Sequence, residues 1–239
     1  GAKDYWENRL RERYDLTGVG DIGLPKSYNE ALYRVRAYGF ELLLNRIDVA
    51  LGNAAVLDIG SGTGFYVDQW LRSNVAEITA TDLTQTAVNH LRENFPDVRV
   101  QQVDIGANEL ELEEETFDLI SAFDVLFHIV DDESYEQAMK NFHALLKPGG
   151  MLLFSDNLLD GKEIRITHQV ARSKLSVFRL LEEIGFELVL VQPMFVLMND
   201  PIRSKNRILR KCFNTIYRIA SSGHLAGKIL GACLSPVDK

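Results

Sequence analysis

The chain has 239 residues, of which 46% are hydrophobic and 25% charged, as in an ordinary globular protein with one substantial core. Its net charge of −8 is unevenly distributed. Residues 201–239 hold eight basic side chains and one acidic one, so they carry +7 and the remainder carries −15. A body this acidic repels phosphate backbones, which argues against general nucleic-acid binding.

The sequence gives no sign of export, of membrane spanning or of a metal site. No run approaches the roughly 18 apolar residues of a membrane-spanning helix. The first ten residues lack the basic and apolar pattern of a secretory signal. Cys212 and Cys233 do not have metal-ligand spacing, and no disulfide framework is expected. We therefore expect a cytoplasmic protein without a bound metal.

Residues 1–50 are predicted to form a helical arm. Residues 4–14 form a short helix in this interpretation, 15–27 a glycine-containing loop and 28–47 an amphipathic helix. The arm is expected to cap the C-terminal edge of the sheet that follows. Its candidates for lining a ligand pocket are Tyr5, Trp6, Tyr14, Tyr28, Tyr33 and Arg36, most of which we expect to be packing residues.

Residues 51–200 are predicted to form a doubly wound, mostly parallel α/β domain, because short apolar runs alternate with helical patterns from residue 54 onward. The strand-like runs are 54–59, 76–81, 98–103, 117–123 and 150–155. The helical patterns lie near 64–73, 84–95, 132–146 and 173–184. Residues 186–199 resemble two strands broken near Pro193, which predicts a hairpin that closes the sheet.

The strongest motif is VLDIGSGTG, residues 56–64. The apolar strand leads into Gly60, Gly62 and Gly64, which permit a tight turn and close backbone approach to a ligand. Nicotinamide enzymes use a similar turn, but their pattern would place Gly or Ala where this chain has Phe65. Asp58 precedes the turn and can meet a cationic amino-acid group, whereas it would repel a pyrophosphate. A purely structural turn is the alternative.

A second motif, ITATDL, ends at Asp82 and Leu83. Asp82 lies 22 residues after Gly60, close to the spacing of about 20 that is typical of an acid binding ribose hydroxyls. By itself an aspartate at a strand end is equally often a turn residue. Together with the glycine turn, Asp82 is a candidate ribose ligand.

Three further blocks follow in order. VQQVDIG places Asp104 and Ile105 at the end of the third strand, where an acid could accept a hydrogen bond from an adenine amino group. FDLISAFDVLFHI leads the fourth strand into Phe123, Asp124 and His128. LLKPGGMLLFSD contains a helix end, a Pro-Gly-Gly turn and the fifth strand.

These five blocks, over residues 54–192, resemble the class I methyltransferases that bind S-adenosylmethionine, and the LKPGG turn is typical of the family's small-molecule branch. The resemblance implies a Rossmann-like, seven-stranded sheet with one reversed strand, to which the sequence pattern adds an N-terminal helical cap and a C-terminal helical extension. It places the glycine turn at the methionine moiety, Asp82 at the ribose and Phe123 near the reacting methyl. The implied cofactor residues are Asp58, Gly60, Ser61, Gly62, Gly64, Asp82, Leu83, Asp104, Ile105 and Phe123.

The acceptor remains open, because the resemblance does not cover the arm or the tail. The fourth strand ends in FDVL and lacks the pattern of enzymes that methylate base amines, so a small-molecule, lipid or glycan acceptor is expected. His128 and His168 are the candidate general bases, with a turn or surface role as the alternative for each. Other hypotheses are a non-catalytic cofactor-binding subunit, an RNA methyltransferase and a nicotinamide oxidoreductase.

The tail, residues 201–239, is predicted to contain a basic amphipathic helix over 202–220. Its apolar face could dock on the acidic body, which attracts it. It could instead lie on anionic lipid as a peripheral membrane helix, or bind a partner. The oligomeric state is not indicated.

Overall fold

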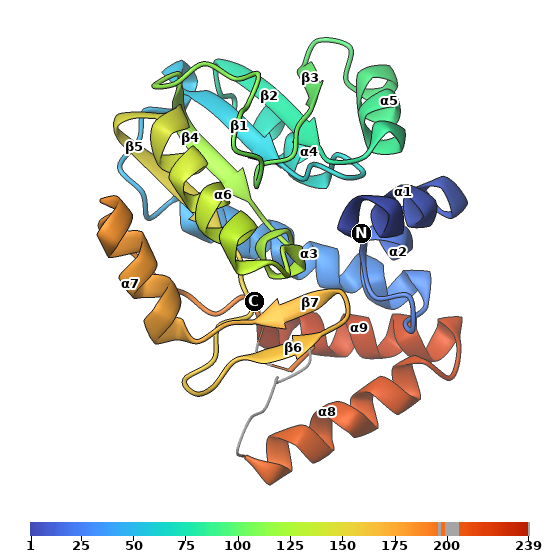
Figure 1. Ribbon diagram of the computed structural model, residues 1–239. Helices are drawn as coiled ribbons and strands as arrows, with labels where there is room; N and C mark the ends of the chain where they lie inside the picture. The colour runs from blue at the N-terminus through green and yellow to red at the C-terminus, as the bar shows by residue number, and fades with distance from the viewer. Residues whose placement is uncertain (196, 199–205, 239) are drawn as a thin grey trace. The chain divides into compact units, whose positions relative to one another are not determined.

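The computed structural model describes residues 1–195, 197–198 and 206–238, and its contacts divide the chain into two compact units (Figure 1). Unit 1 comprises residues 1–8 and 49–189, and unit 2 comprises residues 9–48 and 190–239. Unit 1 has 11 basic and 26 acidic side chains, a charge of −15, whereas unit 2 has 15 and 8, a charge of +7. These units do not coincide with the predicted segments 1–50, 51–200 and 201–239, because most of the N-terminal arm groups with the C-terminal residues.

Unit 1 is built on a sheet of five parallel strands in the order β3-β2-β1-β4-β5. Their bounds are β1 (Ala55–Ile59), β2 (Glu77–Asp82), β3 (Arg99–Gln102), β4 (Phe117–Ala122) and β5 (Leu146–Phe154). Because the strands are parallel, their carboxyl ends meet along one edge, where an open α/β sheet binds its ligands. The Rossmann-like class is therefore confirmed, and β1 to β4 lie within one residue of their predicted bounds. The fifth strand was predicted at 150–155, but β5 begins at Leu146 and includes the predicted Pro-Gly-Gly turn.

Helices cover both faces of this sheet. Their bounds are α4 (Phe65–Arg72), α5 (Gln85–Asn94), α6 (Asp132–Leu145) and α7 (Lys174–Ile184), with short 3-10 turns η1 (Leu51–Asn53) and η2 (Leu126–His128). Side chains alternate between the faces of a strand, so Leu57 and Ile120 join the core cluster under α6 and α7. On the opposite face Trp70 of α4 is fully buried and donates from Nε1 to Ser121 of β4.

The predicted hairpin over residues 186–199 is wrong for the part that the structure describes. Residues 186–195 and 197–198 contain no strand, and Val189 is 68% exposed. Alternating apolar residues suit a strand, but a strand also needs a neighbour to pair with, and this stretch has none in the described structure. A hairpin forms earlier instead, from β6 (Ile164–Ile166) and β7 (Gln169–Ala171), which pair antiparallel in a separate sheet. The seven-stranded sheet is thus corrected to five strands plus this hairpin.

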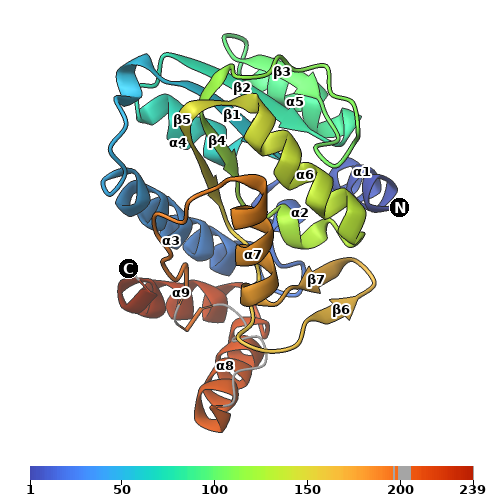
Figure 2. The same ribbon diagram turned by 60° about the vertical axis from the view of Figure 1, so that its left-hand side comes forward.

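Unit 2 is helical. Its helices are the end of α1 (Ala2–Glu12), α2 (Leu16–Val19), α3 (Lys26–Leu44), α8 (Arg207–Ala220) and α9 (His224–Asp238). In both views α9 runs alongside α3 and contacts it, and α9 also contacts α8 (Figures 1 and 2). A Cβ at Gly227 would lie 2.5 Å from Pro25 Cγ, and one at Gly231 would lie 2.6 Å from Ala31 Cβ. Small residues therefore let α9 approach α3 closely.

The arm and tail predictions are met in part. Tyr28 is 1% exposed in the unit 2 core, where its hydroxyl donates to the Met198 carbonyl, so it is a packing residue. The predicted loop 15–27 contains α2, whose first amides donate to the Asp15 carboxylate. The tail helix begins at Arg207, and residues 202–205 of its predicted span lie outside the described residues. No helix in the described ranges is long and apolar enough to cross a bilayer.

Candidate functional site

The glycine turn between β1 and α4 has the conformation that its sequence predicts. Gly60, Gly62 and Gly64 have φ angles of 68°, 53° and 84°, in the left-handed region where glycine is favoured. A Cβ at Gly60 would lie 2.4 Å from Val125 Cγ2, so this position has neither the backbone conformation nor the space for a side chain. The turn thus lies at the carboxyl end of β1, and α4 starts directly after it at Phe65.

Asp58 lies beneath this turn and is 1% exposed. Trp70 Nε1 donates to Ser121 Oγ over 2.9 Å, and Ser121 Oγ donates to Asp58 Oδ1 over 2.5 Å. The second carboxylate oxygen, Oδ2, is buried and has no hydrogen-bond partner in the described structure. Burial raises the pKa of Asp58 from 3.8 to about 6. A buried acceptor without a donor is costly, and an ammonium group would satisfy it.

Asp82 ends β2 and holds the turn in place. Its Oδ2 accepts from the Gly62 amide over 2.9 Å, and its Oδ1 accepts from the amide and the hydroxyl of Thr84. Ser61 adds a bond from its amide to the Thr81 carbonyl. Burial is the largest cause of the raised pKa of Asp82, which these donors partly offset. The carboxylate is therefore a structural clamp, with acceptor capacity left for a ribose hydroxyl.

The remaining predicted cofactor residues follow β2, β3 and β4. Leu83 is half-buried, and its carbonyl accepts from Gln102 Nε2. Asp104 is exposed and accepts from the Gly106 amide, whereas Ile105 is buried and its carbonyl accepts from Asn141. Phe123 is 5% exposed and stacks on Tyr66, with ring centroids 4.5 Å apart. All ten residues thus belong to β1–β4 or to the loops that directly follow them, although their contacts with a cofactor stay a prediction.

Glu7 of α1 caps helix α5. Its carboxylate accepts from the Gln85 amide over 2.8 Å and from the amide and hydroxyl of Thr86. Anionic groups stabilise the N-terminus of a helix, and these contacts lie immediately after the Asp82 clamp. The negative charge of Glu7 also contributes to the raised pKa of Asp82. No local sequence pattern predicts this contact, because 78 residues separate the partners.

The structure brings His128 and His168 together. The hairpin turn between β6 and β7 carries His168, whose carbonyl lies 3.0 Å from His128 Nδ1. The His168 ring stacks on Tyr5 at 5.4 Å, and the His128 ring meets Trp6 edge-on at 4.8 Å. Two of the six candidates for lining a ligand pocket, Tyr5 and Trp6, therefore lie beside the candidate bases.

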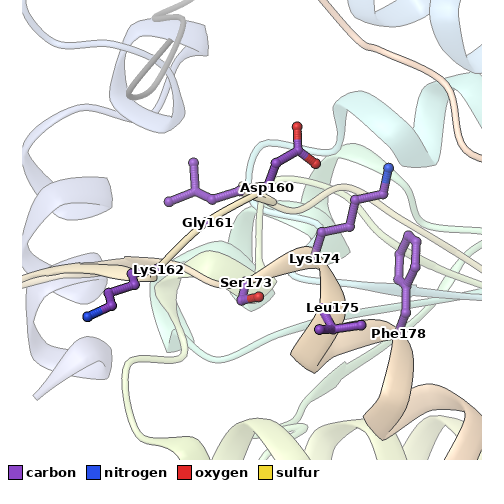
Figure 3. A pocket seen from close by; sticks show the side chains of 8 residues that line it. Asp160, Gly161, Lys162, Ser173, Lys174, Leu175 and Phe178 are labelled. Atoms are coloured by element: carbon purple, nitrogen blue, oxygen red, sulfur yellow. The ribbon is translucent and has the colours of Figure 1, made fainter. Parts of the chain in front are cut away.

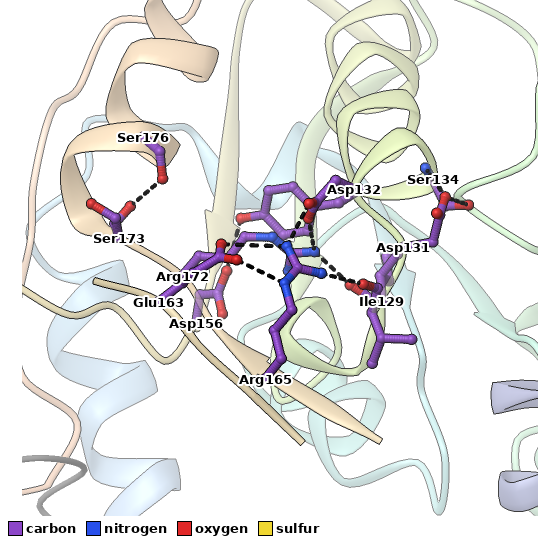
Figure 4. Close-up of polar contacts among 12 residues, drawn as sticks. Ile129, Asp131, Asp132, Ser134, Asp156, Glu163, Arg165, Arg172, Ser173 and Ser176 are labelled. Atoms are coloured by element: carbon purple, nitrogen blue, oxygen red, sulfur yellow. Dashed lines mark hydrogen bonds and ion pairs between the residues drawn. The ribbon is translucent and has the colours of Figure 1, made fainter. Parts of the chain in front are cut away.

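A buried arginine anchors the hairpin at the ends of β4 and β5 (Figure 4). Arg172 is 4% exposed and donates to the Ile129 carbonyl and to Asp132, while Arg165 donates to the same carboxylate. The Arg172 guanidinium lies 3.7 Å from the ring centroid of Tyr135, and the Tyr135 hydroxyl donates to Asp156 over 2.8 Å. The network fixes the β6-β7 hairpin next to η2.

Asp156 is a candidate site residue that sequence reasoning did not identify. It follows β5 by two residues, and the Asp124 amide donates to neighbouring Ser155, so Asp124 and Asp156 lie at the same sheet edge. Burial raises the pKa of Asp156. The ending FSD of the fifth strand was the available signal, since a polar residue after a parallel strand is placed at the ligand-binding edge.

A further pocket lies away from the glycine turn (Figure 3). It has a volume of about 760 Å³ and is lined by the loop after β5 and the start of α7, including Asp160, Lys162, Lys174 and Phe178. None of the predicted cofactor or catalytic residues lines it. We assign it no role in the site.

The residues at the turn fit a cofactor with an ammonium group and a ribose. The buried Asp58 oxygen provides an acceptor for the ammonium, and the left-handed turn gives the close approach. Known sequences agree, since the profile of a methyltransferase domain matches residues 56–150. This segment resembles the methyltransferase domains that use S-adenosylmethionine.

Relatives of the methyltransferase domain have different names and substrates. A ubiquinone biosynthesis O-methyltransferase of Coxiella burnetii is 31% identical over 111 residues, 45% of each chain. EEF1A lysine methyltransferase 2 of Danio rerio is 24% identical over 172 residues, 65% of this chain and 68% of its own. A tRNA U34 carboxymethyltransferase of Pseudoalteromonas atlantica is 29% identical over 120 residues, which are 48% of this chain and 35% of its own. The chain thus spans less than half the length of two of these three.

Solved structures agree on the fold. An S-adenosylmethionine-dependent methyltransferase from Leishmania major superposes with a TM-score of 0.63 at 19% identity, covering 77% of this chain and 71% of its own. At this identity the similarity concerns the fold alone. The methyl acceptor of the present chain is not determined by these relatives.

Proposed function

We propose that the protein transfers a methyl group from S-adenosylmethionine to a small-molecule, lipid or glycan acceptor. The observation that carries the proposal is the buried carboxylate of Asp58, whose Oδ2 has no partner in the described structure and lies beneath the glycine turn. A permanently buried, unsatisfied charge reduces stability, so its presence next to the turn favours a cationic ligand group.

In this proposal Asp58 and the turn bind the methionine moiety, Asp82 the ribose, and Asp104 with Ile105 the adenine. When bound, the sulfonium supplies an activated methyl group, so the protein mainly has to align an acceptor and exclude water. Phe123, with Tyr66 stacked on it, would form an apolar wall beside the reacting centre.

The acceptor would bind where β4 and β5 end. Tyr5, Trp6, His128 and His168 provide aromatic surface there, and Asp156 provides a carboxylate. One of these titratable groups would accept the proton of a hydroxyl acceptor. The surrounding unit carries 26 acidic side chains against 11 basic ones, which disfavours a polyanionic acceptor. A nucleic-acid acceptor, as named for the Pseudoalteromonas relative, is therefore the less favoured alternative.

The experiment is calorimetric titration with S-adenosylhomocysteine and with NAD, followed by a screen of acceptors with isotopically labelled S-adenosylmethionine. We expect one S-adenosylhomocysteine site and weak NAD binding. Tighter binding of NAD would contradict the cofactor assignment. Tight S-adenosylhomocysteine binding without transfer to any acceptor class, RNA included, would instead favour a non-catalytic subunit.

A further inference from the structure

The C-terminal helices present an apolar surface that their packing leaves uncovered. On α8, Leu209, Phe213, Ile216 and Tyr217 are partly buried and Ala220 is fully buried, while Ile208 and Ile219 remain 73% and 47% exposed. The exposed pair lies along one edge of the apolar half of the helix, together with exposed Cys212. The apolar face of α8 is therefore wider than the unit 2 core that covers part of it.

Helix α9 likewise has large apolar side chains that its packing leaves exposed. Gly227, Gly231 and Ser235 form its buried side, and the two glycines pack against the α3 segment. The opposite side carries Leu225, Ile229 and Val237, which are 70%, 54% and 55% exposed. At 100° per residue these three, with Ala232, Cys233 and Pro236, form one continuous apolar face without a charged residue.

Basic side chains border these apolar faces. Arg207, Arg210, Lys211 and Arg218 of α8 are exposed, as is Lys228 of α9. The sequence from residue 207 to residue 237 contains no Asp or Glu. Asp238 is directed inward, since its carboxylate accepts from the Leu197 and Met198 amides. The exposed surface of the helix pair thus combines large apolar residues with purely positive charge.

We propose that α8 and α9 form a docking surface for the interface of a membrane that contains anionic lipid. Exposed apolar side chains would enter the boundary between headgroups and acyl chains, and the bordering basic residues would contact phosphate groups. Each basic residue near an anionic surface adds to binding, and salt screens this part. The positive charge favours an anionic occupant, and the exposed apolar side chains favour one that also offers an apolar interior, which an anionic membrane interface combines. All residues involved belong to unit 2, so the proposal does not depend on the methyl acceptor.

The test is co-sedimentation of the full chain with vesicles of phosphatidylcholine alone and of phosphatidylcholine mixed with phosphatidylglycerol, at low and high salt. We expect binding to the anionic vesicles, loss of binding at high salt and little binding to the neutral ones. The double variant Lys211→Glu/Arg218→Glu should weaken binding at least about tenfold. Its matched control, Arg99→Glu/Arg179→Glu in unit 1, changes the charge equally on exposed positions and should have no such effect.

The apolar part is tested by Leu225→Ser/Ile229→Ser, with Leu188→Ser/Val189→Ser as the control at similarly exposed positions of unit 1. We expect weaker vesicle binding in the α9 variant alone. The proposal is overturned if the full chain ignores anionic vesicles at low salt, or if each variant binds like its control. It is also overturned if Leu225→Ser/Ile229→Ser converts a dimer to a monomer in sedimentation analysis without any vesicle binding, since the face would then serve self-association.

Discussion

At the scale of single residues, the site depends on groups that are unfavourable for the cofactor-free protein. Asp58 has one buried oxygen without a partner, and Gly60 leaves no space for a Cβ. The unpaired Asp58 oxygen would be explained by a cationic ligand group at the turn, whereas Gly60 is required by its left-handed backbone and by the nearby Val125 side chain. Substitutions at these positions should therefore change the stability of the cofactor-free protein and its affinity for the cofactor by different amounts.

Asp58→Asn should stabilise the cofactor-free protein at neutral pH and weaken S-adenosylhomocysteine binding. The folded-state pKa of about 6 exceeds the ordinary 3.8, so protonation favours the folded state. The contribution of Asp58 to stability is therefore greatest below the ordinary pKa and is lost as pH rises through about 6. We expect the variant to gain about 1–3 kcal/mol above pH ~7, and the gain to shrink below pH ~5. Denaturant unfolding across this pH range checks it; a variant that is less stable at neutral pH would contradict it.

Asp82→Ala should weaken cofactor binding by about 2–3 kcal/mol, because it removes a charged hydrogen-bond acceptor. It also releases the Gly62 amide and Thr84, so the melting temperature should fall too. Calorimetry measures the affinity, and Asp97→Ala, at an exposed aspartate in the loop before β3, is the matched control. If affinity stayed within a factor of two, Asp82 would only clamp the turn.

Gly60→Ala should abolish measurable cofactor binding and destabilise unit 1. The new Cβ would meet Val125 at 2.4 Å in a left-handed backbone conformation, which costs about 1 kcal/mol or more before any clash is relieved. Gly161→Ala is the control, since nothing lies within 4 Å of a Cβ there. Equal melting temperatures and affinities in the two variants would be inconsistent with this account.

His128→Ala or His168→Ala, but not both, should lower turnover more than cofactor affinity. Their rings lie 6.5 Å apart beside Tyr5 and Trp6, so one can contact an acceptor while the other supports the hairpin. The readout is kcat with a productive acceptor, together with the affinity for S-adenosylhomocysteine. Unchanged turnover in both variants would direct attention to Asp156 or to catalysis by alignment alone.

At the scale of secondary structure, Glu7 links α1 to the start of α5. Glu7→Gln removes the negative charge at this N-terminus and should lower stability by about 0.5–1 kcal/mol. It also removes a like charge near Asp82, so the pKa of Asp82 should fall. Thermal unfolding and titration by nuclear magnetic resonance measure the two effects. Glu12→Gln, later in α1, is the matched control.

The sequence predicted α4 to α7 and β1 to β5 well, because each has a periodic apolar pattern and a recognisable start or end. The candidate cofactor residues lie in β1 and β2 or in the loops that follow β1 to β4, as predicted, whereas their contacts with a cofactor stay a prediction. Other features depend on distant partners. The Trp70–Ser121–Asp58 chain requires the register of β1 on β4, and the apolar run at 188–191 forms no strand in the described structure. Local pattern cannot supply such pairings.

At the scale of the whole molecule, charge separates the two units, at −15 and +7. The acidic unit contains the methyltransferase domain, so we expect transfer RNA to bind weakly and to leave S-adenosylhomocysteine affinity unchanged. Filter binding at physiological and low salt measures this, with the steep salt dependence of phosphate contacts as the signature to look for. Tight, salt-sensitive binding would favour the RNA methyltransferase hypothesis.

The Glu7 contact also gives the protein an internal spectroscopic reporter. The amide protons of Gln85 and Thr86 both point at the Glu7 carboxylate, and they lie three and four residues after Asp82. Their hydrogen-exchange rates and chemical shifts would register docking of the N-terminal helix without any added label. If ligand binding at Asp82 slows their exchange, then by thermodynamic reciprocity the docked helix must strengthen ligand binding by the same factor.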